Sequence, residues 1–331
     1  MKQSIYNKPT QLLMKLLVPV VLAFSAMSVQ AEPLKFGFSD WPGFVAWQVA
    51  IDKGWFKEAG VDVKFEWFDY SASLDAYAAG KLDAVGVTNG DALVVGSGGG
   101  KSTMFLITDY SSGNDKIIAK HGIKSVADLK GKKVAVEVGL VDHLLIVNAL
   151  KKAGLKETDV TLVNAKTNEL PQTFKANDIS AIGVWQPVAD QALKAVPGSH
   201  EIHTSENSPG LIYDTFAVSP GVAKAKRADL LKVLKVWDRV VEYINNPKTQ
   251  PDAVKIMAAR SGVPPVEYEH FLKGTHLLNL ADGKKAYAKG EGFDSIYGST
   301  NYVNAFNVAN AVYKTPEKID NYFDPTFYNT K

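Results

Sequence analysis

The chain has 331 residues, and its 37 lysines and arginines stand against 35 aspartates and glutamates, for a net charge of +2. This near balance excludes the basic stripe of a typical nucleic-acid-binding protein, so we expect no nucleic-acid partner. Cysteine is absent, which excludes disulfides, thiol nucleophiles and thiolate metal ligands. The length beyond the first 31 residues, about 300 residues, is enough for two compact lobes.

The first 31 residues have the pattern of a secretory signal. Lysines precede a mostly apolar stretch at 16–26, and small residues occupy positions 29 and 31, just before Glu32. A basic N-terminal region, a short apolar run and small residues at the cleavage site predict a cleaved signal peptide. The apolar run is shorter than the roughly 20 residues that span a bilayer. We expect an exported protein whose mature form begins near Glu32; the alternative is an uncleaved N-terminal anchor.

The next part of the chain alternates between predicted strands and helices. Alternating or short apolar runs predict strands at 34–41, 61–70 and 82–88. Helical periodicity and stop signals predict helices at 44–60, at 71–81 with Ser71 or Ser73 as the N-cap, and within 89–100. This order indicates a parallel sheet with helices on its faces.

A second alternating module begins near Asn114. Its predicted strands are 116–120, 133–138, 160–165, 179–185 and 211–219. Its predicted helical segments are 125–132, 143–154, 169–177 and 187–195. From Lys226 onward the pattern is mostly helical, and we expect this tail to pack against the first lobe.

Polar and aromatic residues cluster where these predicted strands end. Ligands of open parallel sheets bind beyond the carboxyl ends of the strands, and small hydroxyls, aromatic rings and carboxylates suit a small polar solute. The candidate ligand-binding residues are Trp41, Phe44, Tyr70, Ser71, Ser73, Asn89, Asp91, Glu137, Gly139, His143, Trp185 and Asp214.

Several of these candidates have a simpler structural explanation. Ser71 and Ser73 are explained by helix capping alone, and Asn89 with its following glycine by a turn. Glu137 ends a strand rich in small apolar residues and Asp214 interrupts one. A half-buried carboxylate needs a partner, so if both acids face a cleft, the ligand carries an amine or another cationic group.

Signatures of catalysis are missing. The sequence has no Gly-x-Ser-x-Gly elbow, no His-Glu-x-x-His and no phosphate loop. The glycine-rich segment 96–102 lacks the phosphate-loop spacing and is interpreted as a flexible connection. The six histidines show no close pair at metal-ligand spacing. We expect neither a metal nor a cofactor.

An ordered series of segments resembles the nitrate, sulfonate and taurine group of periplasmic solute-binding proteins, which includes THI5-like members. The segments are GWFKEAGVDVKFEWFDYSASLDAYAAGKLDAVGV, DLKGKKVAVEVG, HLLIVNALKKAGL, ISAIGVWQP and ARSGVPPVEYEHFLKGTHLL. The last one looks similar to taurine-binding proteins in particular.

The resemblance implies a type II periplasmic-binding fold, an α/β architecture of two doubly wound lobes around a ligand cleft. We expect lobe 1 to comprise 32–114 and 217–331, and lobe 2 to comprise 115–216. Crossing segments near Ser112–Lys116 and Thr215–Ser219 would let the lobes close. The implied partners are a small solute and an ABC importer, with its membrane permease and its ATPase, and we expect a monomer.

The charges of the candidate residues limit the chemical class of the ligand but leave alternatives open. A nitrate or sulfonate needs strong cationic donors, yet no arginine lies among the candidate residues, whereas Asp40, Asp91, Glu137 and Asp214 bring four acids. A zwitterion such as taurine or a cationic nitrogen compound fits better. The alternatives are a binder of a thiamine pyrimidine precursor, or a THI5-like enzyme that synthesises it with His143 or His121; export speaks against the enzyme.

Overall fold

The computed structural model describes Met1 and residues 32–329. The predicted signal segment at 2–31 lies outside the described residues. No helix in the described part of the chain has the length and apolar character needed to cross a membrane. Pro33–Lys331 form one unit, which contains two β-sheets.

The first sheet has six strands in the order β11-β4-β10-β3-β1-β2. The strands are β1 (Leu34–Phe38), β2 (Val63–Trp67), β3 (Ala84–Thr88), β4 (Thr103–Ser111), β10 (Tyr213–Val218) and β11 (Thr275–Leu277). β1 pairs in parallel with β2 and β3, while β10 runs antiparallel between β3 and β4. The carboxyl ends of the first four strands and the amino end of β10 therefore lie at the same edge.

The second sheet has five strands in the order β7-β6-β8-β5-β9. They are β5 (Asp115–Ala119), β6 (Lys133–Val136), β7 (Thr161–Asn164), β8 (Ile179–Trp185) and β9 (His200–Thr204). Successive residues of β5 enter different apolar clusters: Ile117 packs with the main core, and Ile118 packs with the cluster around Phe174. Side chains alternate between the faces of a strand, so both faces of this sheet are buried.

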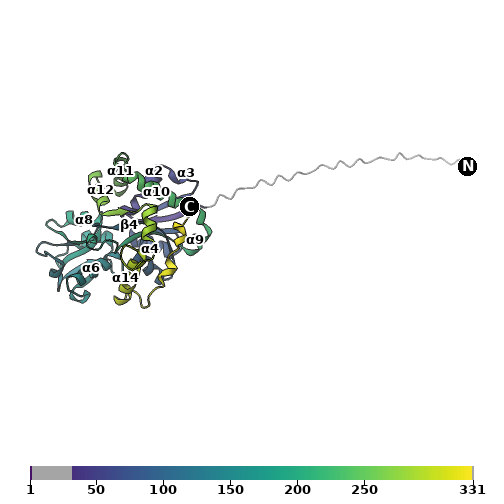
Figure 1. Cartoon of the computed structure of the whole chain (residues 1–331). Helices are drawn as coiled ribbons and strands as arrows, with labels where there is room; N and C mark the ends of the chain where they lie inside the picture. The colour runs from purple at the N-terminus through teal and green to yellow at the C-terminus, as the bar shows by residue number, and fades with distance from the viewer. Residues whose placement is uncertain (2–31, 330–331) are drawn as a thin grey trace. The chain divides into compact units, whose positions relative to one another are not determined.

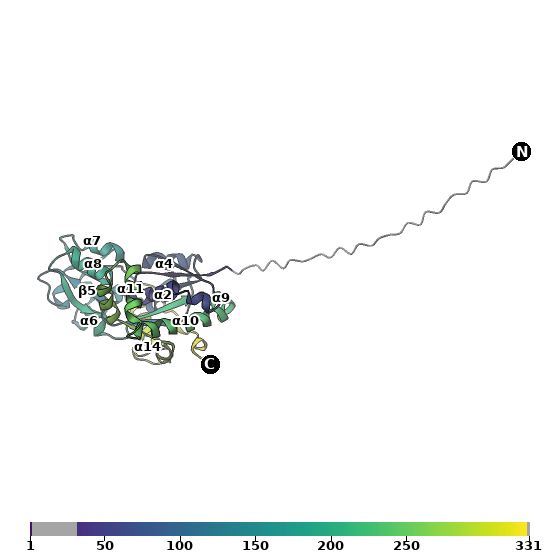
Figure 2. The same ribbon diagram turned by 90° about the horizontal axis from the view of Figure 1, so that it is seen from above.

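Helices cover both sheets. Around the first sheet lie α1 (Pro42–Val45), α2 (Trp47–Asp52), α3 (Trp55–Glu58), α4 (Tyr70–Ala78), α5 (Asn89–Ser97), α9 (Pro220–Ala225), α10 (Arg227–Asn245), α11 (Gln250–Ser261), α12 (Pro265–Lys273), α13 (Leu280–Ala286) and α14 (Ile296–Ala309). Around the second lie α6 (Val141–Lys152), α7 (Leu170–Thr173) and α8 (Val188–Ala195). In Figures 1 and 2, α6 and α8 lie at one end of the unit and α9 lies at the other.

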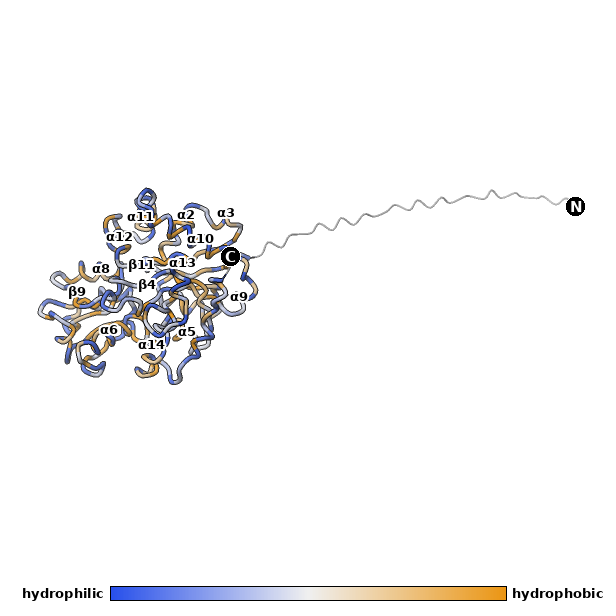
Figure 3. The backbone as a smooth tube through the Cα atoms, viewed as in Figure 1, coloured by the Kyte–Doolittle hydropathy of each residue, from blue (hydrophilic) through white to orange (hydrophobic). Residues whose placement is uncertain are grey.

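Helix α10 shows how the helical tail joins the first lobe. Its buried residues are apolar and recur every three or four positions, whereas most of the residues between them are polar. Figure 3 shows orange and blue segments mixed in the region of α10, α2 and α13. The buried face reaches α2, where the Trp47 and Trp237 rings lie 4.8 Å apart. Truncating such a buried aromatic side chain costs about 3–5 kcal/mol, and the contact between the two rings joins α10 to α2 in the main apolar cluster.

Two sequence-based expectations about elements are wrong. The segment 44–60 contains three short helices or parts of them instead of one. Gly54 separates α2 from α3, because its φ of 69° is not compatible with a continuing right-handed helix. The N-cap of α4 is Asp69 rather than Ser71 or Ser73, so the helix begins earlier than the serines suggest.

The second connection between the sheets also differs from expectation. The first connection runs from Ser111 to Asp115, within the expected region. The chain returns between Thr204 and Tyr213 rather than at Thr215–Ser219, because Tyr213–Val218 is a strand of the first sheet. Residues 213–216, assigned to lobe 2 in the predicted division, therefore belong to the first sheet, while the division into lobes stays a prediction.

Candidate functional site

A small pocket lies where the strand ends of the two sheets face each other. The first sheet and its helices contribute Trp41, Phe44, Tyr70, Thr88 and Asp214. The second sheet with α6 contributes Asp115, Val141 and Trp185, and the return connection adds Ile212. The space left free between these side chains is about 10 Å³, which is room for about one water molecule. The side chains therefore fill the space between the two walls almost completely.

Aromatic side chains form much of the lining, and polar contacts fix them. The Trp41 indole N–H donates to Asp109 Oδ1 at 3.0 Å, and Trp41 is only 5% exposed. The Tyr70 hydroxyl donates to Asp91 Oδ2 at 2.7 Å and accepts the Thr88 N–H at 3.1 Å. Both rings are therefore held in place before any ligand arrives.

Glycine at position 43 is required by this arrangement. A Cβ atom on Gly43 would lie 1.9 Å from Asp109 Oδ2, so only a residue without a side chain lets α1 approach the end of β4. This close approach brings Trp41 within reach of Asp109.

Three buried carboxyl groups belong to the first sheet and α5. Asp109 and Asp214 are directly opposite each other on β4 and β10, and Asp91 lies in the first turn of α5. Burial raises the pKa of Asp91 and of Asp109 to about 7. Burial and the neighbouring Asp109 raise the pKa of Asp214 well above its ordinary value. Two facing carboxyls that resist ionising together favour a shared proton.

Two more buried acids approach from the second sheet, and one follows β1. Asp115 opposes Trp185 in the sheet register, and burial raises its pKa to about 6. Asp142, in the first turn of α6, has a pKa well above the ordinary value, mainly through burial and then through the charge of Asp115. Burial also raises the pKa of Asp40, after β1, to about 6.

Several contacts cross from one wall of the pocket to the other. The Tyr70 and Trp185 rings meet edge to face with centroids 5.3 Å apart, and the Trp185 indole N–H lies 3.5 Å from Asp40 Oδ1. At the exposed rim, the Asn168 amide donates to Asp69 Oδ2 at 3.0 Å. These contacts hold the two walls together in the compact arrangement.

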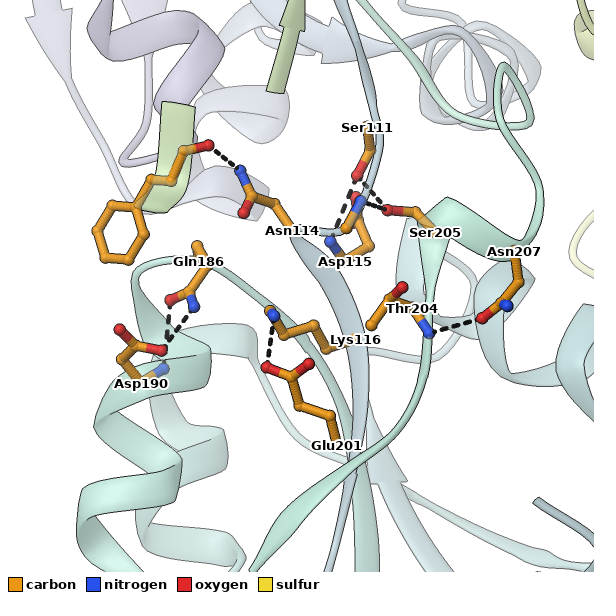
Figure 4. Close-up of polar contacts among 12 residues, drawn as sticks. Ser111, Asn114, Asp115, Lys116, Gln186, Asp190, Glu201, Thr204, Ser205 and Asn207 are labelled. Carbon is orange, nitrogen blue, oxygen red and sulfur yellow. Dashed lines mark hydrogen bonds and ion pairs between the residues drawn. The ribbon is translucent and has the colours of Figure 1, made fainter. Parts of the chain in front are cut away.

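The two connections between the sheets are bonded to each other. The Ser111 and Ser205 hydroxyls lie 2.6 Å apart, and Ser205 Oγ also accepts the Gly113 N–H at 2.7 Å. Figure 4 shows Ser205 beside Ser111 and Asp115. In the first connection, the Asn114 amide donates to the Phe271 carbonyl and to Thr275 Oγ1, both at 2.7 Å. Asp115, a pocket residue, thus directly follows this bonded segment.

About half of the predicted site residues lie at the pocket. Trp41, Phe44, Tyr70, Trp185 and Asp214 line it. Asp91 lies behind Tyr70, bonded to its hydroxyl. The fold therefore brings the predicted aromatic and acidic residues together from both sheets. Their contact with a ligand stays a prediction.

Three predicted residues of the first lobe have other surroundings. Ser73 is buried and its hydroxyl donates to the Tyr70 carbonyl one turn earlier, while Ser71 lies half-buried on α4 outside the pocket lining. The Asn89 amide donates to Ser299 and Thr300 and accepts the Tyr213 N–H. Asn89 therefore joins α5, α14 and β10.

The three predicted residues of the β6–α6 region are also engaged elsewhere. Glu137 Oε2 accepts both the N–H and the hydroxyl of Thr167. The Gly139 N–H donates to His143 Nδ1 at 3.2 Å. The His143 ring packs against Phe306 and lies 3.4 Å from Glu157, and burial lowers its pKa. None of the three lines the pocket.

Sequence reasoning missed two of the acids, Asp109 and Asp115. Asp109 interrupts an apolar strand, which is the same signal that singled out Asp214, so applying that signal to every strand would have found it. Asp115 is the first residue of its strand and precedes the strand predicted at 116–120, so the signal does not reach it. Val141 and Ile212 carry no such signal, because their position depends on how the two sheets face each other.

Structures of known proteins share this architecture. The aliphatic sulphonate-binding protein of Escherichia coli superposes with a TM-score of 0.73 at 18% identity, covering 90% of this chain and 99% of that one. The nitrate-binding protein of Synechocystis PCC 6803 also gives 0.73, at 13% identity, covering 90% of this chain and 87% of that one. The predicted periplasmic-binding-protein fold is confirmed.

Sequence relatives are binding proteins. A putative binding protein of Brucella abortus is 31% identical over 172 residues, which are 51% of this chain and 53% of that protein; the chain thus matches about half of that relative's length. The taurine-binding periplasmic protein of E. coli is 27% identical over 269 residues, or 78% of this chain and 82% of that protein. A family model described as NMT1/THI5 like matches residues 41–248. The chain therefore belongs to the NMT1/THI5-like family.

Proposed function

We propose that the protein is the periplasmic solute-binding component of an ABC importer. It captures a small aminated solute between its two lobes and delivers it to a membrane permease and the associated ATPase. The observation that carries this proposal is the pocket between the two sheets, with Trp41 and Asp214 on one wall and Asp115 and Trp185 on the other.

The connections between the sheets support closure as the mechanism. Only two segments join the sheets among the described residues, around 112–114 and 205–212, so a small change in their backbone angles moves one wall relative to the other. The pocket is too small for a solute in the compact arrangement. Opening admits the solute, and the contacts of Trp185 with Tyr70 and Asp40 form again on closure.

The surroundings of the histidines favour binding over chemistry. The family includes THI5-like members, for which His143 and His121 were the candidate chemical groups. The His143 ring packs against Phe306, away from the pocket lining, and His121 is exposed in a turn. Neither imidazole reaches a solute held between Trp41 and Trp185.

Native mass spectrometry of the protein isolated from cells, followed by thermal unfolding with the identified compound, tests the proposal. A bound solute should appear as a discrete added mass. Supplied at a hundredfold excess over its dissociation constant, it should stabilise the protein by about 2.7 kcal/mol. The compound should be recovered unchanged after long incubation. Conversion of the compound would reject the binding function in favour of an enzyme.

A further inference from the structure

Unpartnered carboxylate oxygens surround the pocket. Asp115 and Asp214 are each 2% exposed and line it, and Oδ2 of each accepts no hydrogen bond from the described residues. Both oxygens of the nearby Asp142 are also without a donor. Buried polar groups in proteins are bonded in roughly nine cases out of ten. One shared proton satisfies the Asp109–Asp214 pair but leaves Asp115 Oδ2 and both oxygens of Asp142 without donors.

The protein supplies little positive charge to balance these acids. The main electrostatic neighbours of Asp91, Asp142 and Asp214 are other carboxyl groups. The positive charge of Lys116 opposes the rise in the pKa of Asp115, but the Lys116 ammonium group forms an ion pair with Glu201. The residues lining the pocket include no lysine, arginine or histidine.

The place where an anion could bind is occupied by an acid. Free N–H groups at the start of a helix bind anions, and α6 begins at the pocket with Val141. The backbone of Val141 instead interacts with the Asp91 carboxylate, which opposes the rise in its pKa. A sulfonate or nitrate would displace this contact and meet several carboxylates.

The rest of the lining suits an organic cation. The faces of Trp and Tyr rings attract cations, most strongly where water is excluded, and Trp41, Tyr70 and Trp185 are each at most 6% exposed. The acids are spread around the pocket: no set of three carboxylates or histidines in the described chain converges to hold a metal ion. A cation with several separated N–H donors matches this spacing better than a metal.

We propose that the pocket binds a small organic cation with several N–H donors and no anionic group, of the guanidinium or alkylammonium kind. This inference rests on the proposed function and specifies its ligand. The cation supplies the missing donor at Asp115 Oδ2 and balances the negative charge that remains on the Asp109–Asp214 pair, while the rings of Trp41 and Trp185 enclose it. A preference for a cation without an anionic group distinguishes this pocket from sites for taurine, sulfonates or nitrate, because each of those compounds carries an anionic group.

Isothermal titration calorimetry at pH 7.5 tests this with a panel of matched compounds. The panel contains guanidinium, methylammonium, urea, taurine, methanesulfonate and nitrate at millimolar concentrations. Urea has the shape of guanidinium without its charge. Because each lost charge-assisted hydrogen bond costs about 1.5–3 kcal/mol, we expect the better cation to bind at least about tenfold tighter than urea, taurine and both anions. Comparing the two cations distinguishes guanidinium from ammonium chemistry.

Two variants connect the affinity to the acids. Asp214→Asn and Asp115→Asn keep the side-chain shape but remove a charge, and each should weaken cation binding at least about tenfold. Asp178→Asn removes an exposed charge that pairs with Lys133 far from the pocket lining, and it should bind like the wild type. Circular dichroism confirms that all three variants are folded.

Three results would overturn the inference. Taurine, an anion or urea binding as tightly as the better cation would contradict the charge argument while leaving solute capture intact. Unchanged cation affinity in both pocket variants would show that Asp115 and Asp214 do not bind the cation. If no panel compound binds, the ligand class is rejected, and the mass-spectrometric experiment still decides the proposed function independently.

Discussion

At the scale of single residues, the main feature of the molecule is a group of acids buried where the protein offers them few donors. Asp214 on β10 faces Asp109 from β4, Asp115 from β5 and Asp91 from α5. Burying a carboxylate without a partner is costly, so such groups favour their neutral form. The unliganded protein therefore carries a stability cost at neutral pH, which a bound cation would relieve.

This cost predicts that the unliganded protein becomes less stable as pH rises from 5 to 7.5. Burial raises the pKa of Asp91 and Asp109 to about 7 and that of Asp40 and Asp115 to about 6. The folded state thus holds protons that the unfolded chain, with pKa values near 4, has already released. By linkage, stability is full below the unfolded pKa values and falls as pH rises through the folded ones.

Urea unfolding of the unliganded protein at pH 5 and pH 7.5 checks this prediction. The midpoint should be higher at pH 5. The histidines His143 and His203, whose pKa values burial lowers, act in the opposite direction near pH 6.5, but the raised acids outnumber them. Asp214→Asn should flatten the pH dependence and raise the midpoint at pH 7.5. A midpoint that is higher at pH 7.5 in the wild type would contradict the assignment.

The sequence alone predicts such a residue only where the residues next to it in the chain form a recognisable pattern. Asp214 stands out because an acid interrupts an apolar strand, and Trp41 because an aromatic residue follows a strand end; both line the pocket. Asn89 and Glu137 look similar in sequence but bond to Ser299 and Thr167. Whether a polar side chain meets a ligand or a neighbouring segment depends on tertiary packing, which the local pattern does not contain.

At the scale of elements, the return connection shows the same limit. The run LIYDTFAVS reads as a buried strand, and the strand is there. Its sheet is set by pairing with β3 and β4, partners more than 100 residues away, and no local signal distinguishes the sheets. The register of that pairing also places Asp214 opposite Asp109, which turns two separate acids into a facing pair.

The bonds of Ser205 predict how strongly the two connections depend on each other. Ser205→Ala removes the hydroxyl that bonds Ser111 and accepts the Gly113 N–H. A buried donor left unsatisfied costs about 1–3 kcal/mol, so the midpoint of urea unfolding should fall accordingly. The connections should also become more mobile, which hydrogen exchange at the Gly113 amide measures.

Ser97→Ala is the matched control for this change. Its exposed hydroxyl donates to the Val94 carbonyl within its own helix turn, and substitutions at such sites are usually within about 0.5 kcal/mol. If Ser205→Ala is as stable as Ser97→Ala and the Gly113 amide exchanges at the wild-type rate, the hydroxyl pair does not hold the connections together.

At the scale of the whole molecule, two bonded connections join the two sheets in the described part of the chain. The cores form from apolar periodicity that the sequence shows plainly, as in α6 and α10. Contacts across the pocket, including those of Tyr70 and Asp40 with Trp185, contribute to the relative position of the sheets. We predict that such contacts permit two arrangements of the sheets, and that a solute that binds only one of them shifts the population.

This view predicts that a solute accelerates chemical cross-linking across the pocket rim. The natural chain has no cysteine, so two introduced cysteines are the only thiols. In the double variant Asp69→Cys with Asn168→Cys, the thiols replace side chains that bond across the rim at 3.0 Å. A short bis-maleimide should join them in a fraction of molecules without solute and at a higher rate with it, because closure brings the two positions together.

The control is the pair Lys289→Cys with Asp320→Cys, which lies at an exposed ion pair among helices of the first sheet. Its cross-linking rate should not respond to solute. Equal responses of both pairs would indicate a general change in thiol reactivity, and no response of the rim pair to a solute that binds would show that capture proceeds without closure.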